Sequence, residues 1–396
     1  MILFILNHMK LSPITRNRLL LSIIYLSFIS LGLPDGSLGI SWPLIRLDFN
    51  QPLEAAGLIT LITLPLSALS SIYSHKLSNL LGINKVTLLS ALLTASSLLG
   101  IGFSRNYTML IFFSIGLGLG QGAVDSLLNA YVAKHYSSRH MTWLHGFWGV
   151  GASLGPTIMT TVLKYGYTWN FAYFTLSTLQ GIIAFILFLS LGLWLSNQKE
   201  EIKLKVKVKF DNRMLFGIAL FFLYVGIELS VGLWSNSYLV EEIGLLPSTS
   251  GYYIASYYAS IMIGRFLSGT VSNRLGNRNM IRLGLFLSGC GALLLLIFRD
   301  QTIIRIGLML VGLGFAPLYP SMMHETPQRF NEVQAHLLIS YQVGIAYIGG
   351  TIISTGLGYL FKPFGISILY PIILIIIVMM FIISEIYNRV TPKQGH

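Results

Sequence analysis

One stretch near the end of the chain decides the fold class. Residues 366–383 read ISILYPIILIIIVMMFII, without a charged side chain. A membrane-spanning β-strand alternates apolar and polar residues, whereas this stretch is apolar on every face, as a membrane-spanning helix is. The stretch therefore predicts an all-α integral membrane protein, since a helix satisfies its own backbone hydrogen bonds within a bilayer.

The composition of the whole chain supports this prediction. Of its 396 residues 54% are hydrophobic and 10% are charged, against about 25% charged in soluble domains. A soluble catalytic domain is therefore excluded. The formal net charge of +12 indicates basic cytoplasmic loops in a membrane protein, and we expect no nucleic-acid partner. The single cysteine, Cys290, excludes an intramolecular disulfide.

Twelve apolar stretches are each long enough to cross a hydrocarbon core, which takes about 20 helical residues. They cover residues 19–42, 54–73, 86–104, 108–133, 143–163, 171–195, 214–235, 251–270, 281–298, 302–323, 335–360 and 366–384. The sequence therefore predicts twelve transmembrane helices.

The basic residues give an independent test of this topology. With the N-terminus inside, twenty of the 26 Lys and Arg residues fall in cytoplasmic loops and six in external ones. Cytoplasmic loops carry such an excess of basic residues. We therefore expect a multi-pass protein of the bacterial cytoplasmic (inner) membrane with both termini in the cytoplasm.

The chain also repeats itself weakly. Residues 78–82 (SNLLG) resemble residues 272–276 (SNRLG). The repeat predicts two pseudo-symmetric six-helix halves, residues 1–196 and 214–396, joined by a cytoplasmic linker at 197–213, as is typical of transporters. The linker is rich in lysine and either is solvated or touches anionic membrane lipids.

Three carboxylates lie deep within the predicted spans. Asp35, Asp125 and Glu228 stand about 16, 17 and 14 residues from the start of theirs, or about 20 to 25 Å at 1.5 Å per residue. No Lys or Arg lies mid-span in this assignment, so we expect no permanent counter-ion. Desolvation without one favours the protonated form of a carboxyl group, as proton coupling requires. The alternative is a carboxyl group that only hydrogen-bonds a neighbouring helix.

The surroundings of the first two carboxylates favour a functional role. The segment 32–36 (GLPDG) interrupts a helix, because proline lacks a backbone donor and glycine tolerates unwinding. Gln121, Asp125 and Asn129 follow one another at i, i+4 and i+8, so they share one helix face. We interpret this polar stripe as a cavity wall, in which Asp35, Gln121 and Asn129 contact a solute.

Further candidate solute contacts are aromatic or polar side chains within spans: His145, Trp148, Tyr224, Tyr319 and Gln342. Histidine can relay a proton, and an indole ring can stack on the apolar face of a sugar. Helix packing for His145 and an interfacial position for Trp148 are equally good interpretations.

Other classes of protein lack support in the sequence. No Walker phosphate loop is present, which argues against ATP-driven export. His75, His135 and His140 do not form a metal set, and no nucleophile and base with recognisable partners are present. We therefore expect neither an enzyme nor a bound metal or cofactor.

A loop in the second half carries a family resemblance. Residues 269–278 (GTVSNRLGNR) resemble the loop signature of the major facilitator superfamily, Gly-x-x-x-Asp-Arg-x-Gly-Arg-Lys. The signature maps onto Gly269, Asn273, Arg274, Gly276 and Arg278, which implies a gating role for them. Asn273 replaces the usual aspartate, so a gating salt bridge built on that acid is not expected.

Three segments carry a narrower resemblance. Residues 116–129 (GLGLGQGAVDSLLN), 144–156 (LHGFWGVGASLGP) and 312–320 (GLGFAPLYP) resemble the fucose permease-like branch, the fucose:proton symporters and their relatives. The resemblance implies a proton-coupled carrier, often for sugars, with carboxylates on the first and fourth helices. Asp35 and Asp125 occupy those positions, although the sugar-transporting relatives have a glutamate at the latter.

Together these patterns predict a monomeric carrier of a small polar solute, a sugar first, coupled to protons. In this interpretation Asp125 binds the proton, while Asp35 binds solute hydroxyls or shares in protonation. The main alternative is a proton-driven exporter of amphipathic or cationic compounds, which Glu228 and the aromatic residues accommodate. A third reading is a receptor or scaffold on a carrier fold.

Overall fold

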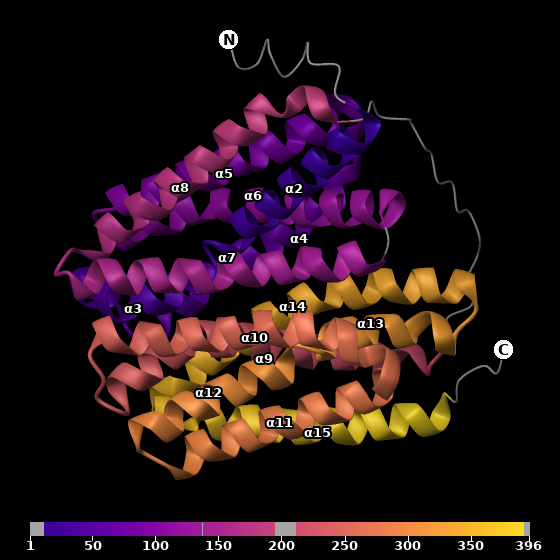
Figure 1. The fold of residues 1–396 in the computed structure, drawn as a ribbon. Helices are drawn as coiled ribbons and strands as arrows, with labels where there is room; N and C mark the ends of the chain where they lie inside the picture. The colour runs from indigo at the N-terminus through magenta and orange to yellow at the C-terminus, as the bar shows by residue number, and fades with distance from the viewer. Residues whose placement is uncertain (1–11, 137, 195–210, 392–396) are drawn as a thin grey trace. The chain divides into compact units, whose positions relative to one another are not determined.

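The computed structural model describes residues 12–136, 138–194 and 211–391, and all regular secondary structure in these residues is helical (Figure 1). The all-α prediction is confirmed. All but the last three residues of the predicted linker at 197–213 lie outside the described residues, as do both ends of the chain.

Packing divides the chain into two compact units. Residues 1–51 and 62–201 form unit 1, and residues 52–61 and 202–396 form unit 2. The helices of unit 1 are α2 (Pro13–Gly32), α3 (Ser37–Asp48), α4 (Ala55–Leu81, from residue 62), α5 (Ile83–Phe103), α6 (Tyr107–His135), α7 (Ser138–Lys164), α8 (Trp169–Leu189) and the short η1 (Leu191–Leu193).

The helices of unit 2 also follow one another in chain order. They are α9 (Met214–Glu241), α10 (Pro247–Leu275), α11 (Asn277–Ile297), α12 (Gln301–Phe315), α13 (Leu318–Arg329), α14 (Glu332–Phe364), the short η2 (Ile366–Ile368) and α15 (Leu369–Val390). Each of the twelve predicted spans coincides with one of these helices or, for the first and the tenth, with the pairs α2–α3 and α12–α13.

Most of these helices are apolar enough to cross a membrane. Ten segments of the described residues meet that condition by length and composition, with the pairs α2–α3 and α12–α13 each forming one segment. The two long helices outside this set are α7 and α10, of 27 and 29 residues. These two are long enough to span but more polar than their neighbours.

Side-chain caps fix where several helices begin. The side-chain oxygen of Asn106 accepts a hydrogen bond from the Met109 backbone N–H at the start of α6, at 2.9 Å. Asp300 accepts from the backbone N–H groups of Thr302 and Ile303 at the start of α12. The first N–H groups of a helix have no partner within it, so such caps stabilise the helix at that residue.

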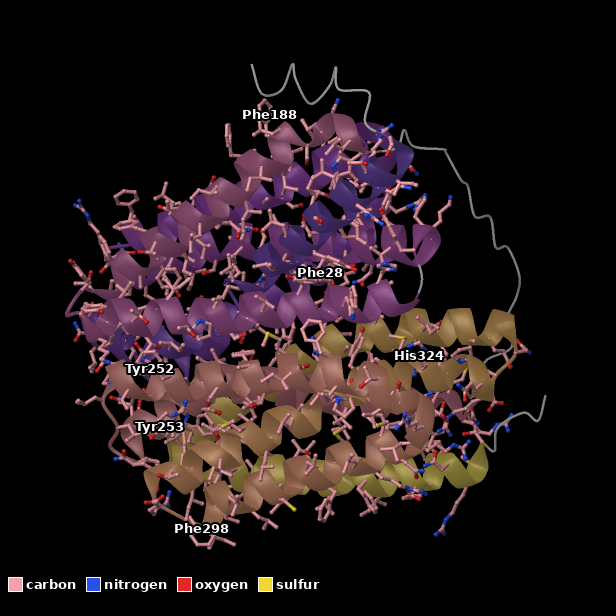
Figure 2. The ribbon with its side chains drawn as sticks, viewed as in Figure 1. Phe28, Phe188, Tyr252, Tyr253, Phe298 and His324 are labelled. Atoms are coloured by element: carbon pink, nitrogen blue, oxygen red, sulfur yellow. The ribbon has the colours of Figure 1, made fainter. Side chains whose placement is uncertain are left out.

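Each unit has its own apolar interior. In unit 1 the core gathers around Ile24, Phe28, Leu128 and Leu144 from α2, α6 and α7. Figure 2 shows Phe28 among the helices of this unit and Phe188 at their outer edge, where its side chain is exposed. An exposed phenylalanine on a long apolar helix is expected where lipid, not water, surrounds the protein.

Candidate functional site

Asp35 lies at a break in the first membrane span. The helix α2 ends at Gly32 and α3 begins at Ser37, and the intervening turn contains Pro34, which cannot donate a backbone hydrogen bond. Gly36 has φ 74°, a left-handed conformation that favours glycine. The predicted interruption at 32–36 is thus present, and it removes the residues around Asp35 from the regular helix.

Two neutral donors hold the Asp35 carboxylate. Trp148 donates from its indole Nε1 to Oδ2 at 2.8 Å, and Gln121 donates from Nε2 to Oδ1 at 3.1 Å. These donors come from α7 and α6, so three predicted site residues from two helices and the α2–α3 turn meet. Both donors are uncharged, so they stabilise the anion without cancelling its charge.

Close approach of two backbones places Trp148 within reach of Asp35. A Cβ atom on Gly32 would lie 2.2 Å from the Trp148 carbonyl oxygen, and one on Gly151 would lie 2.0 Å from the Ile29 carbonyl oxygen. Only residues without a Cβ fit at these two positions. The contact of α2 with α7 therefore depends on glycine, as is common between membrane helices.

The polar stripe of α6 forms a second group next to the first. Asn129 donates from Nδ2 to Oδ1 of Asp125 at 2.9 Å and also to the Asp125 carbonyl oxygen. Gln121 stands one turn before Asp125 on the same helix and binds Asp35. The predicted shared face thus links the environments of both unit 1 carboxylates.

His145 takes part in aromatic packing. Its ring meets Phe28 of α2 edge to face, with centroids 6.0 Å apart, and Phe147 stacks on Tyr25 at 4.5 Å. These contacts join α7 to α2 on the N-terminal side of the glycine contact in both helices. They give His145 a packing role, and its role with a solute stays a prediction.

Glu228 in unit 2 has a charged partner. Its Oε1 lies 3.2 Å from Nη2 of Arg265, and the two side chains are 12% and 11% exposed. The expectation that no Lys or Arg lies mid-span is therefore wrong for this pair. Assignment of Arg265 to the cytoplasmic group of basic residues hid the fact that α10 continues to Leu275.

Aromatic side chains surround this ion pair. The buried Tyr224 donates its hydroxyl to the Phe315 carbonyl oxygen at 3.2 Å, and Tyr257 donates to the Glu228 carbonyl oxygen at 3.3 Å. The ring of Tyr319, at the start of α13, lies 6.3 Å from that of Tyr224. Of the residues predicted for a site in the second half, Tyr224, Glu228 and Tyr319 thus lie together.

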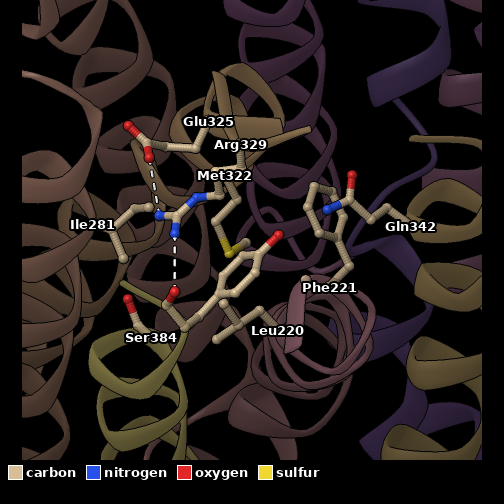
Figure 3. Close-up of a pocket in the computed structure, with 10 residues that line it drawn as sticks. Leu220, Phe221, Ile281, Met322, Glu325, Arg329, Gln342 and Ser384 are labelled. Carbon is tan, nitrogen blue, oxygen red and sulfur yellow. Dashed lines mark hydrogen bonds and ion pairs between the residues drawn. The ribbon is translucent and has the colours of Figure 1, made fainter. Parts of the chain in front are cut away.

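A second ion cluster in unit 2 involves the loop motif. Arg278 contacts Glu325 at 3.2 Å. Arg329 contacts the same carboxylate at 2.9 Å (Figure 3). Glu325 and Arg329 are both 2% exposed. Neither residue is among the predicted site residues. The opposite charges of Glu325 and Arg329 do indicate an ion pair from sequence, because side chains at i and i+4 are neighbours on a helix.

The other motif residues have less defined roles. Gly276 has φ 74° and ends α10, a conformation that favours glycine. Gly269 and Arg274 are exposed, and the side chain of Asn273 lies outside the described residues. Of the five motif positions, Arg278 therefore has the clearest structural function, as a partner of Glu325.

Gln342 lies beside this second cluster. Its Oε1 accepts a hydrogen bond from Thr326 at 3.1 Å, and its side chain is buried. It lines a small cavity with Phe221, Glu325 and Arg329, with room for about one water molecule (Figure 3). The cavity is too small for a sugar in this conformation.

The described residues offer no metal site. Within them, no three His, Cys, Asp or Glu side chains gather closely enough to hold a metal ion.

Comparison with known families decides the class. The family described as Major Facilitator Superfamily matches residues 24–354. The chain belongs to the Major Facilitator Superfamily. This membership, together with the apolar helices, makes it an integral multi-pass membrane protein and a transporter rather than an enzyme.

Individual relatives of this superfamily member are distant. The chain is 25% identical over 281 residues to the transporter y4wD of Sinorhizobium fredii, covering 69% of this chain and 72% of that protein. It is 23% identical over 253 residues to a cis,cis-muconate transport protein of Acinetobacter baylyi, covering 59% of this chain and 61% of the relative. The second match thus spans less than two thirds of the relative's length.

A solved structure confirms the fold of this superfamily member. A bacterial homologue of the human lysosomal transporter Spinster, in an inward-facing and occupied conformation, superposes with a TM-score of 0.71. The alignment covers 96% of this chain and 97% of that one, at 14% sequence identity. Similarity at this level of identity concerns the fold, and the predicted twelve-helix major facilitator fold is confirmed.

Proposed function

We propose that this transporter couples the movement of a small polar solute, a sugar first, to protons by alternating access, as in the fucose permease-like branch. The observation that carries the proposal is Asp35, held at the break of the first span by Trp148 and Gln121. A carboxylate within a membrane span is by default a candidate functional site.

The unit 1 site has the chemistry that a sugar requires. The Asp35 carboxylate accepts hydrogen bonds from solute hydroxyl groups, and Gln121 offers both a donor and an acceptor. The Trp148 ring provides an apolar surface for a sugar ring, while its N–H orients the carboxylate. All three side chains are partly exposed within unit 1.

Asp125 is the proposed proton site. Asn129 donates to one carboxylate oxygen at 2.9 Å, which orients the group on the same face as Gln121. A proton arriving at Asp125 removes its charge one helical turn from the solute contacts. Solute binding and protonation are then coupled through the single face of α6.

We also propose a membrane, an orientation and an oligomeric state for the protein. We place both termini in the cytoplasm of a bacterial cell, with the protein in the inner membrane and working as a monomer among membrane lipids. The asymmetric distribution of Lys and Arg supports this orientation. The two-half organisation with a linker at 197–213 belongs to the same proposal.

Proton flux in proteoliposomes tests the proposal. A pH-sensitive dye inside the vesicles reports acidification when members of a sugar panel are added outside. We expect acidification by at least one sugar with the wild type and none with Asp125→Asn. Asp300→Asn is the matched control, because asparagine caps α12 as well as aspartate does.

A second candidate function is proton-driven export of amphipathic or cationic compounds. The observation that favours it is again Asp35, since an anion held by neutral donors also binds a cationic solute. In the same assay this candidate predicts no change of lumenal pH with any sugar and a change of lumenal pH with a cationic compound. That result would contradict sugar transport.

A further inference from the structure

The ion pair of Glu228 and Arg265 lies in the middle of two long helices. Glu228 stands fourteen residues beyond Met214, and Arg265 stands ten residues before Leu275. At 1.5 Å per residue these positions lie about 21 Å and about 15 Å from the helix ends. Charged side chains at such depth are rare and mark solute or ion pathways.

The geometry of this pair differs from that of the pair Arg282–Glu385, which also lies in unit 2. Arg282 binds Glu385 with two nitrogens at 2.7 and 2.8 Å. The Arg265 contact joins Nη2 to Oε1 at 3.2 Å, longer than the roughly 2.7–2.9 Å of strong charge-assisted hydrogen bonds. The Glu228 pair is therefore not locked in the paired, two-bond geometry that Arg282 and Glu385 adopt.

The Glu325 cluster provides a second contrast. Arg329 is held there by Glu325, by Asn388 at 2.6 Å and by the hydroxyl of Thr391 at 2.9 Å, and it lies over the ring of Tyr387. These contacts tie α13 to α15 and leave both charged groups 2% exposed. Arg265 and Glu228 are 11% and 12% exposed, so they are less completely enclosed than the Glu325 cluster.

Among the described residues, three polar side chains are identified beside Glu228. Arg265 and Tyr257 come from α10, and Tyr224 comes from the same helix as Glu228. Both tyrosine hydroxyls donate to main-chain carbonyl oxygens. The guanidinium is thus the permanent charge in this group, and guanidinium geometry matches a carboxylate with two parallel N–H donors.

We propose that Arg265 binds the carboxylate group of an acidic solute in exchange for Glu228, and that the displaced Glu228 takes up a proton. The solute anion replaces the glutamate anion at the guanidinium, and one proton from solution neutralises the released glutamate. The site gains one negative charge from the solute and one positive charge from the proton, so its net charge does not change. This inference rests on the proposed function and narrows its solute to carboxylic acids, such as sugar acids.

Proton uptake on binding predicts that the affinity for the acidic solute depends on pH. If one proton accompanies each solute anion, the apparent Kd rises about tenfold for each pH unit over the range in which that proton is taken up on binding. A purely structural ion pair gives no such slope. Neutral compounds of the same shape bind without the slope, because they do not displace Glu228.

The experiment measures binding to the purified full-length protein by calorimetry. The probes are matched acids and neutral compounds: gluconate with sorbitol, galacturonate with galactose, and glycerate with glycerol. We expect at least one acid to bind more than tenfold tighter than its neutral counterpart, with the stated pH slope.

Two variants separate exchange from a structural role. Glu228→Gln removes the competing anion and the proton acceptor, so the acid binds tightly at every pH and the slope disappears. The double variant R265Q/E228Q replaces both charges by amides of similar size and loses the preference for the acid. The matched control R282Q/E385Q, a more exposed pair between α11 and α15, keeps both the preference and the slope.

Three results would overturn the inference. They are the absence of any acid that binds tighter than its neutral counterpart, an unchanged pH slope in Glu228→Gln, and an unchanged acid preference in the double variant. Because binding is measured without transport, this test is independent of the Asp125→Asn assay. Preferential binding of the acid without proton-coupled uptake would contradict the proposed function but not the exchange at Arg265. Proton-coupled uptake without preferential binding of the acid would contradict the exchange but not the proposed function.

Discussion

Asp35 and Glu228 are two carboxylates within membrane spans that the protein holds in opposite ways. Asp35 in unit 1 receives hydrogen bonds from the indole of Trp148 and the amide of Gln121, both of which are uncharged donors. Glu228 in unit 2 faces the guanidinium of Arg265. The comparison teaches that neutral donors orient one carboxylate, whereas a guanidinium pairs with the other.

The largest expected effect comes from removing one member of the ion pair. Arg265→Gln leaves Glu228 buried without a guanidinium, and breaking a buried pair in this way costs about 3–5 kcal/mol of stability. The double variant R265Q/E228Q removes both charges and recovers most of this loss. Thermal unfolding of the detergent-solubilised protein, followed by tryptophan fluorescence, checks both expectations. Equal stability of the single and double variants would show that the pair is not coupled.

The next effect concerns the packing that positions the neutral donors of Asp35. Gly151→Ala places a methyl group against the Ile29 carbonyl oxygen, so α2 and α7 move apart at an expected cost of about 1–3 kcal/mol. Solute uptake and thermal stability should both fall. Gly181→Ala in α8 is the matched control, because no other group lies within 4 Å of its added methyl group. Similar losses in the two variants would refute a special role for the α2–α7 contact.

A smaller effect tests the indole donor itself. Trp148→Phe keeps the aromatic ring but removes the N–H that binds Asp35 Oδ2. A hydrogen bond to a charged group contributes about 1.5–3 kcal/mol, so we expect solute affinity to fall at least about tenfold. Uptake kinetics over a range of solute concentrations measure this change. Trp143→Phe on the same helix, where the ring contacts His140, should leave the affinity near the wild-type value.

The smallest effect is expected for an exposed pair of an arginine and a carboxylate. Arg213 donates to Asp211 just before α9, and these hydrogen bonds hold the pKa of Asp211 below its ordinary value. A lowered pKa contributes stability above the unfolded-state value, and that contribution disappears as the pH falls through the folded-state value. Exposed pairs contribute little, so Asp211→Asn should change stability by less than about 0.5 kcal/mol at neutral pH. Thermal unfolding at neutral and acidic pH measures this difference, and a larger loss would mean that exposure does not weaken the pair.

The helices were predictable from sequence because hydrophobicity is a local property. Each of the twelve apolar stretches became a helix or a pair of helices, including the interruption around Asp35, which Pro34 and Gly36 announce. The shared face of Gln121, Asp125 and Asn129 follows from helical periodicity alone. Such features need no knowledge of which helix lies against which.

The partners of the carboxylates were not predictable in the same way. Arg265 and Glu228 are separated by 37 positions in the sequence, and only the packing of α10 on α9 brings them together. A charge count along the chain assigns Arg265 to a loop, because the count does not reveal that its helix extends ten residues further. Trp148 reaches Asp35 through a glycine contact, which a sequence with 39 glycines does not single out.

The polarity of α7 and α10 has a consequence for biogenesis. These are the two long helices that do not qualify as independent membrane spans, and they carry Trp148 and Arg265. A helix with such residues enters the bilayer less readily than an apolar one. Their sequence neighbours α6, α8, α9 and α11 are all apolar enough to span. We therefore expect α7 and α10 to be retained in the membrane during synthesis with the help of these neighbours, so that insertion, as well as transport, depends on the helices around each site.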